Sequence, residues 1–176
     1  IGDGTQFCGT SKFDFDNSAF DVLISSGYKW MLAGYGIAFI LVKEAFYNNN
    51  FFLTDKIKMT ECLEIGHYDM LAIGSLSFSL KKLQILIDSI EKKLVDYSKI
   101  LISELTKLNM IDKKIKKRNQ HSTIFNINDK NDKLYMFLTR NNVVCSQRGN
   151  GVRVSFSFFN TKSEIKKFIQ ILKKFN

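Results

Sequence analysis

The stretch Ser25-Ser26-Gly27-Tyr28-Lys29-Trp30-Met31-Leu32-Ala33-Gly34-Tyr35-Gly36 separates two short apolar runs and carries one lysine. Residues 20–24 before it, Phe-Asp-Val-Leu-Ile, are typical of a buried strand rather than a helix. Residues 37–42 after it, Ile-Ala-Phe-Ile-Leu-Val, predict a second buried strand. Lys29 is therefore predicted just beyond a strand end, where burial and neighbouring charge make an amine nucleophilic.

Lys29 also fits a simpler interpretation. The chain contains 26 Lys+Arg, and most such side chains are solvated charges at the surface. The residue type alone therefore does not distinguish a reactive lysine from a solvated one.

The composition predicts a packed protein. Of 176 residues, 45% are hydrophobic and 13% are aromatic, which is enough for a core. The formal net charge of +9 often indicates a nucleic acid or an anionic surface as partner. The lysines are spread along predicted helices, however, and the basic run 113–118 has no interleaved aromatic residues. We interpret this run as a solvated linker face and expect no nucleic-acid partner; a nucleic-acid patch is the alternative.

Cysteine usage and hydropathy indicate a cytoplasmic protein. Cys8, Cys62 and Cys145 are too few and too scattered for a disulfide framework, and their spacing does not suit a metal site. No apolar run approaches twenty residues without a charge, so we expect no membrane span. We also expect no signal peptide, and the opening residues suggest that the chain begins within a longer protein.

Residues 1–6, Ile-Gly-Asp-Gly-Thr-Gln, predict the end of a strand that runs into a turn. The glycines on either side of Asp3 let the backbone bend and leave the carboxylate exposed. Open α/β sheets bind their ligands at strand ends. A helix cap is the alternative role for Asp3.

The rest of the chain predicts a long helix followed by a small mixed layer. Residues 70–108 repeat apolar positions every three and four residues, with a coiled coil as the alternative. The remainder alternates strand and helix and predicts an α+β layer, with elements at 122–127, 134–138, 143–145 and 151–155 and an amphipathic helix at 163–175. We expect three regions, at 1–68, 69–110 and 111–176.

Three groups of residues together resemble the class V aminotransferase family. They are Asp-Gly-x-Gln at 3–6, Ser-Gly-Tyr-Lys-Trp-Met-Leu at 26–32, and Arg-Gly-Asn-Gly-Val-Arg-Val-Ser at 148–155 with Phe-Asn-Thr at 159–161. This family of pyridoxal-phosphate (PLP) enzymes is related to cysteine desulfurases, kynureninases and isopenicillin epimerase-like proteins. The resemblance implies an α/β fold type I PLP-dependent transferase, of which the chain holds the end of the large-domain sheet and a small C-terminal α+β domain.

The resemblance also implies residue roles around the cofactor. Lys29 would form the Schiff base, an aldimine, with PLP and move the substrate α-proton. Asp3 would pair with the protonated pyridine nitrogen, and Gln6 would lie beside the phenolic oxygen of the ring. Ser26 and Tyr28 would offer hydroxyl donors to the cofactor phosphate.

Two further roles follow from the same resemblance. His67, in Glu-x-Gly-His at 64–67, would reach the phosphate of the neighbouring subunit's cofactor, which implies a homodimer with shared active sites. Packing at a helix start is the alternative for His67. Arg153 would hold the substrate α-carboxylate through a bidentate pair, with Arg148 as a second candidate. An ion pair with a surface carboxylate is the alternative for Arg153.

The implied function is PLP-dependent chemistry on an amino acid, as a transaminase, an epimerase or a lyase. A cysteine desulfurase is disfavoured, because its nucleophilic cysteine would lie in a mobile loop well ahead of the arginine, whereas Cys145 lies in a predicted apolar strand close to it. The resemblance covers only the C-terminal half of the family's usual length, so we expect a partial chain. A non-catalytic remnant of the fold, or an interaction module, is the alternative.

Overall fold

The structure is a computed structural model that describes residues 1–48, 66–129 and 133–175. Its contacts divide the chain into two compact units, Ile1–Asp88 and Ser89–Asn176. The division falls inside the long helix α3 (Met70–Lys107), which contributes residues to both units.

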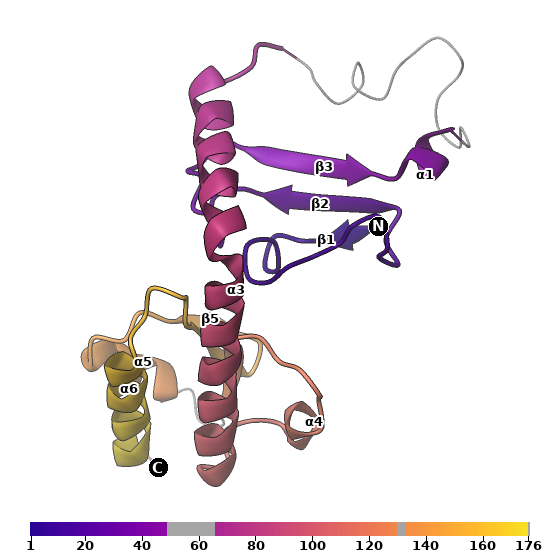
Figure 1. Cartoon of the computed structure of the whole chain (residues 1–176). Helices are drawn as coiled ribbons and strands as arrows, with labels where there is room; N and C mark the ends of the chain where they lie inside the picture. The colour runs from indigo at the N-terminus through magenta and orange to yellow at the C-terminus, as the bar shows by residue number, and fades with distance from the viewer. Residues whose placement is uncertain (49–65, 130–132, 176) are drawn as a thin grey trace. The chain divides into compact units, whose positions relative to one another are not determined.

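Unit 1 contains a three-stranded sheet in the order β1 (Gly2–Asp3), β2 (Val22–Ser26) and β3 (Ala38–Val42), with β2 in the middle (Figure 1). Strand β1 runs parallel to β2, and β3 runs antiparallel to β2. The strands predicted around 20–24 and 37–42 are therefore confirmed, as is the strand end at Asp3. Because parallel strands end at the same edge of a sheet, Asp3 and the segment after Ser26 share that edge.

The two faces of β2 differ in burial. Leu23 and Ser25 are 2% and 0% exposed, whereas Ile24 is 41% exposed and its partner on β3, Ile40, is 39% exposed. Successive side chains of a strand point to opposite faces. The prediction of a buried strand is thus correct for one face of β2, and the described residues leave the other face open. For β3 the prediction of a buried strand is wrong, because none of its residues is buried among the described residues.

The polar, asparagine-rich composition of residues 43–60 predicts an exposed loop after β3, but this stretch begins with a helix. Residues Glu44–Asn48 form the short helix α1. The remainder of the predicted loop, from residue 49 onward, lies outside the described residues, as does Cys62.

Helix α3 confirms the predicted long helix and has a defined signal at each end. The Asp69 carboxylate accepts the backbone N–H groups of Leu71 and Ala72, both at 3.0 Å, which is an N-cap. At the other end Asn109 adopts a left-handed backbone with φ 54°, and the N–H of Met110 bonds to the carbonyl of Leu105 at 3.0 Å. The helix therefore stops where the apolar periodicity of the sequence stops.

By length and composition, α3 could cross a membrane. Its most apolar 18-residue window has a mean hydropathy of 1.4, and 6% of that window is buried. A single helix of this kind is weak evidence for a span, because helices of soluble proteins pass the same test. The expectation of no membrane span stays a prediction.

Unit 2 contains a second sheet in the order β4 (Ile124–Asn128), β6 (Gly151–Ser155) and β5 (Ser146–Arg148), with all pairs antiparallel. One face of this sheet packs into a core with α5 (Leu134–Arg140), α6 (Lys162–Phe175) and the later part of α3. The short helix α4 (Lys113–Lys116) covers most of the basic run. The largest fully buried side chains of the core include Tyr97, Leu101, Leu105, Phe125, Ile127, Leu134, Leu138, Ile165 and Leu172.

Local sequence explains the helices of unit 2 and corrects one strand. The Asp129 carboxylate accepts the N–H groups at the start of α5. Helix α6 begins with a capping box, in which Thr161 and Glu164 bond each other's backbone N–H groups. The strand predicted at 143–145 is wrong: the strand is β5, which begins three residues later at Ser146, and Val144 is 99% exposed.

Candidate active site

A tight turn after β2 determines where Lys29 lies. The Gly27 N–H donates to the carbonyl of Ile37 at 2.9 Å, and the Ala33 N–H donates to the carbonyl of Gly27 at 2.9 Å. A Cβ on residue 27 would lie 2.7 Å from the Cγ2 atom of Ile37, so the turn requires glycine there. Backbone hydrogen bonds at both ends therefore hold the seven-residue segment from Gly27 to Ala33 beside the edge of the sheet.

Asp3 is ionised and oriented by its own turn. Its Oδ1 accepts the Thr5 N–H at 2.9 Å, which is a local turn rather than a helix cap. Hydrogen bonds from the backbone and hydroxyl of Thr5 hold the pKa of Asp3 below its usual range, and the positive charge of Lys29 lowers it further. The structure therefore brings Asp3 and Lys29 within electrostatic reach of each other.

The side chain of Lys29 is half-buried against an aromatic pair. Its Nζ lies 5.5 Å from the centroid of the Tyr28 ring. The Tyr28 ring stacks on Tyr35, with centroids 5.2 Å apart and planes 20° apart. These contacts restrict the lysine, which forms no ion pair with a carboxylate among the described residues.

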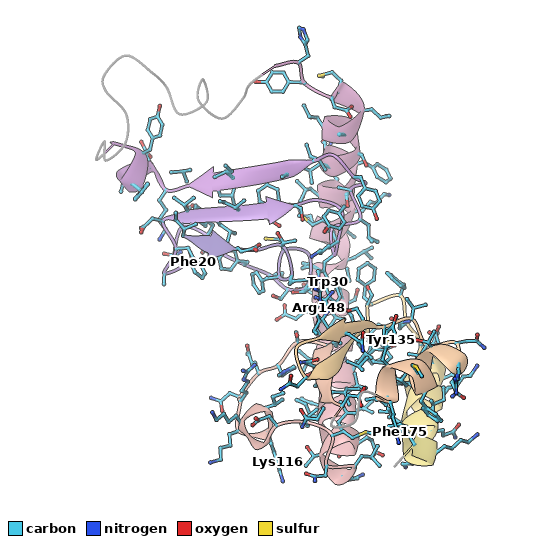
Figure 2. All side chains as sticks on the ribbon, turned by 180° about the vertical axis from the view of Figure 1, so that it is seen from behind. Phe20, Trp30, Lys116, Tyr135, Arg148 and Phe175 are labelled. Atoms are coloured by element: carbon cyan, nitrogen blue, oxygen red, sulfur yellow. The ribbon has the colours of Figure 1, made fainter. Side chains whose placement is uncertain are left out.

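Gln6 is held by a residue that the sequence analysis did not select. The Trp30 Nε1 donates to the Gln6 Oε1 at 3.1 Å, and Trp30 is 7% exposed. Figure 2 shows Phe20 near the start of β2 and Trp30 beyond its other end. Trp30 is the single tryptophan of the chain and follows the candidate lysine directly, which is the signal that could have singled it out.

Ser26 offers an unused hydroxyl at the same edge. Its N–H bonds to the Thr5 Oγ1 at 3.4 Å, but its own buried Oγ has no hydrogen-bond partner among the described residues. Buried hydroxyl groups are normally paired, so this unpaired donor lacks an acceptor that the described residues do not supply. A phosphate oxygen is an acceptor that this donor suits, so the residues present fit PLP.

The remaining predicted residues lie elsewhere. His67 is exposed in the segment before α3, and residues 64 and 65 of its motif lie outside the described residues. Arg153 belongs to unit 2, half-buried on β6 opposite Asn126 and Ser146. The structure shows no ion pair for Arg153 with any described residue, so the alternative of a surface ion pair is not observed. Within unit 1, the same sheet edge gathers Asp3, Gln6, Ser26, Tyr28 and Lys29.

Sequence comparison finds little. No family model matches the chain. The uncharacterized protein C11D3.10 of Schizosaccharomyces pombe is 35% identical over 95 residues, which are 52% of this chain and 21% of that protein. The chain therefore spans about a fifth of this curated relative.

Solved structures identify the fold. A cysteine desulfurase from Thermococcus onnurineus superposes with a TM-score of 0.79 at 17% identity, covering 98% of this chain and 51% of that one. A NifS-like protein from Rickettsia africae gives 0.75 at 18% identity, covering 98% and 52%. The ornithine δ-aminotransferase of Plasmodium falciparum gives 0.64 at 15% identity, covering 98% and 44%. The chain thus has the mixed α/β fold of fold type I PLP-dependent transferases and spans about half of it.

Proposed function

We propose that this chain is the C-terminal half of a PLP-dependent enzyme that acts on an amino acid, of the class V aminotransferase type. The observation that carries the proposal is the edge shared by β1 and β2, where Asp3 lies within electrostatic reach of Lys29 and the buried Oγ of Ser26 has no partner among the described residues. Ligands of open α/β sheets bind at such edges.

Each residue at this edge has a role in the proposal. PLP, when bound, supplies a ring that accepts the electrons released at the substrate α-carbon. Asp3, kept ionised by Thr5 and Lys29, would accept a hydrogen bond from the ring nitrogen. Lys29 would attach the cofactor through Nζ and carry the α-proton on the same atom. Ser26 would donate its hydroxyl to the phosphate.

The remaining roles in the proposal follow from the family resemblance. Gln6, oriented by Trp30, would lie beside the phenolic oxygen of the ring. Tyr28 would offer its hydroxyl to the phosphate, and His67 would reach the phosphate in the partner subunit of a cytoplasmic homodimer. Arg153 would hold the substrate α-carboxylate, since its guanidinium is uncommitted among the described residues.

The reaction would be a transamination, an epimerisation or an elimination. Cys145 does not suit cysteine desulfurase chemistry, because burial raises the pKa of its thiol. A nucleophilic cysteine needs the opposite shift, toward the thiolate. Cys145 therefore does not supply the sulfur nucleophile in this proposal.

Borohydride reduction at saturating PLP, followed by peptide mapping of the natural polypeptide, tests the proposal. We expect a phosphopyridoxyl group on Lys29 and none in the variant Lys29→Arg. The variant Lys81→Arg makes the same substitution on the exposed surface of α3, so it serves as a control and should keep the label on Lys29. A label on another lysine would contradict the role of Lys29, and no label at all would favour the non-catalytic remnant.

A further inference from the structure

The sheet of unit 2 has one apolar and one polar face. Phe125, Ile127, Val152 and Val154 fill the core side, and none is more than 3% exposed. The residues between them along β4 and β6 point to the other side. Cross-strand partners share a face, so the register places Asn126, Arg153 and Ser146 in one row across that polar face.

Arg148 lies on the same face, diagonally from Arg153. It is two residues along β5 from Ser146, the direct partner of Arg153. Diagonal neighbours of this kind are roughly 7–8 Å apart in an antiparallel pair, within reach of two long side chains. Arg148 is labelled on β5 in Figure 2.

The Asn126 side chain lies over Gly151 and contacts the backbone of Arg148. Residue 151, opposite Arg148, is a glycine, and a Cβ there would lie 2.8 Å from the Asn126 Oδ1. The Asn126 Nδ2 donates to the carbonyl of Arg148 at 3.1 Å. Because an amide nitrogen has two hydrogens, one N–H of Asn126 stays available to a ligand on this polar face.

The charge of this face is not balanced within the described residues. Neither Arg148 nor Arg153 takes part in the ion pairs that the structure shows there. The Asp129 carboxylate, one residue after β4, is committed to the N–H groups of Lys133, Leu134 and Tyr135. Like charges at neighbouring positions of a sheet repel each other, so two unpaired guanidinium groups favour a ligand that carries two anions.

We propose that this polar face, formed by Asn126, Arg148 and Arg153, binds an amino acid whose side chain carries a second negative charge. Arg153 takes the α-carboxylate, Arg148 takes the side-chain anion, and Asn126 donates its remaining N–H between them. The identification of this ligand as the substrate rests on the proposed function. A neutral amino acid leaves Arg148 unpaired and binds more weakly.

Calorimetric titration of the chain with L-glutamate, L-aspartate, O-phospho-L-serine and L-alanine tests the proposal. Charge-assisted hydrogen bonds to one guanidinium predict about tenfold tighter binding of an acidic amino acid than of L-alanine. We expect Arg148→Gln to remove this preference and Arg148→Lys to reduce it, since lysine keeps the charge but not the planar fork. Arg140→Gln, on α5, removes the same charge from another surface and should leave the preference intact. Far-UV circular dichroism checks that each variant is folded.

The outcomes separate this inference from the proposed function. Tighter binding of the carboxylate or the phosphate side chain supports the inference, and the comparison of L-glutamate with O-phospho-L-serine identifies the preferred anion. Equal affinity for L-glutamate and L-alanine overturns it, as does an effect of Arg148→Gln no larger than that of Arg140→Gln. If acidic amino acids bind more tightly than L-alanine but Lys29 takes no borohydride label, the proposed function is contradicted and the anion site is still supported.

Discussion

The two units of this chain differ in how completely they bury their apolar side chains. In unit 2, one face of the sheet and three helices enclose a continuous core around Phe125 and Leu138. In unit 1, the buried hydrophobic residues among those described are only Leu23, Trp30, Met31, Ala33 and Ala72. Apolar side chains remain exposed on both its sheet and its part of α3, such as Ile24, Ile40 and Phe78.

This difference bears on where the candidate site lies. Sheets with parallel strands are normally covered on both faces, yet the Ile24 face of β2 is open. The chain also spans about half of the solved structures that it resembles. The residues of the candidate active site therefore lie in the unit that lacks cover, whereas the polar face with Arg153 lies in the unit with a closed core.

The largest expected effect compares a buried apolar residue of unit 2 with an exposed apolar residue of unit 1. Phe125→Ala should destabilise unit 2 by about 3–5 kcal/mol, because it empties a fully buried site. Ile24→Ala should cost under about 1 kcal/mol, since Ile24 is already well exposed. Hydrogen exchange of each unit under increasing urea measures both, and Trp30 fluorescence reports on unit 1 separately. Equal losses in the two variants would mean that Ile24 is covered in solution.

Two glycines provide a second comparison. Gly151→Ala should destabilise unit 2 by about 1–3 kcal/mol, because the new Cβ would lie 2.6 Å from the Ile127 carbonyl oxygen, a backbone atom. Gly36→Ala meets no atom within 4 Å, but its φ of +82° should cost unit 1 about 1 kcal/mol through backbone strain alone. Thermal melting of both variants gives the ranking, and a larger loss for Gly36→Ala would contradict it.

Sequence patterns predicted the parts of the fold that depend on local periodicity. Strand β2, strand β3 and helix α3 each carry an apolar repeat. Asp3 ends β1 and Lys29 follows the end of β2, and glycines mark both places. The hydrogen bond between Trp30 and Gln6 joins residues 24 positions apart, so no local sequence pattern predicts it. The sequence also did not predict that one face of β2 is open. Apolar residues occur on both faces of this strand, and the sequence does not show which face is covered.

Helix caps offer a third and smaller comparison. Thr161→Ala should cost unit 2 about 1 kcal/mol, because it removes one half of the capping box with Glu164. Asp69→Ala should cost a similar amount in unit 1, where Asp69 caps α3. Hydrogen exchange at the first turn of each helix measures the two effects. Faster exchange throughout unit 1 in Asp69→Ala, rather than in the first turn, would show that the open unit depends more strongly on its cap.

The smallest expected effect concerns two exposed carboxyl groups, Glu164 in unit 2 and Asp3 in unit 1. The backbone N–H and then the hydroxyl of Thr161 hold the pKa of Glu164 below its usual range. The Thr5 bonds, and then the charge of Lys29, do the same for the pKa of Asp3.

A carboxyl whose pKa is lower in the folded state stabilises the fold at neutral pH, and this contribution disappears as the pH falls through the folded pKa. Each unit should therefore lose a little stability below about pH 4, and solvent screening keeps the loss small. In an NMR titration, Thr161→Ala should raise the pKa of Glu164 and leave that of Asp3 unchanged. Lys29→Gln should raise the pKa of Asp3 and leave that of Glu164 unchanged. If Lys29→Gln left the pKa of Asp3 where it was, the two groups would not be neighbours in solution, and the electrostatic pairing at the edge of β1 and β2 would lose its support.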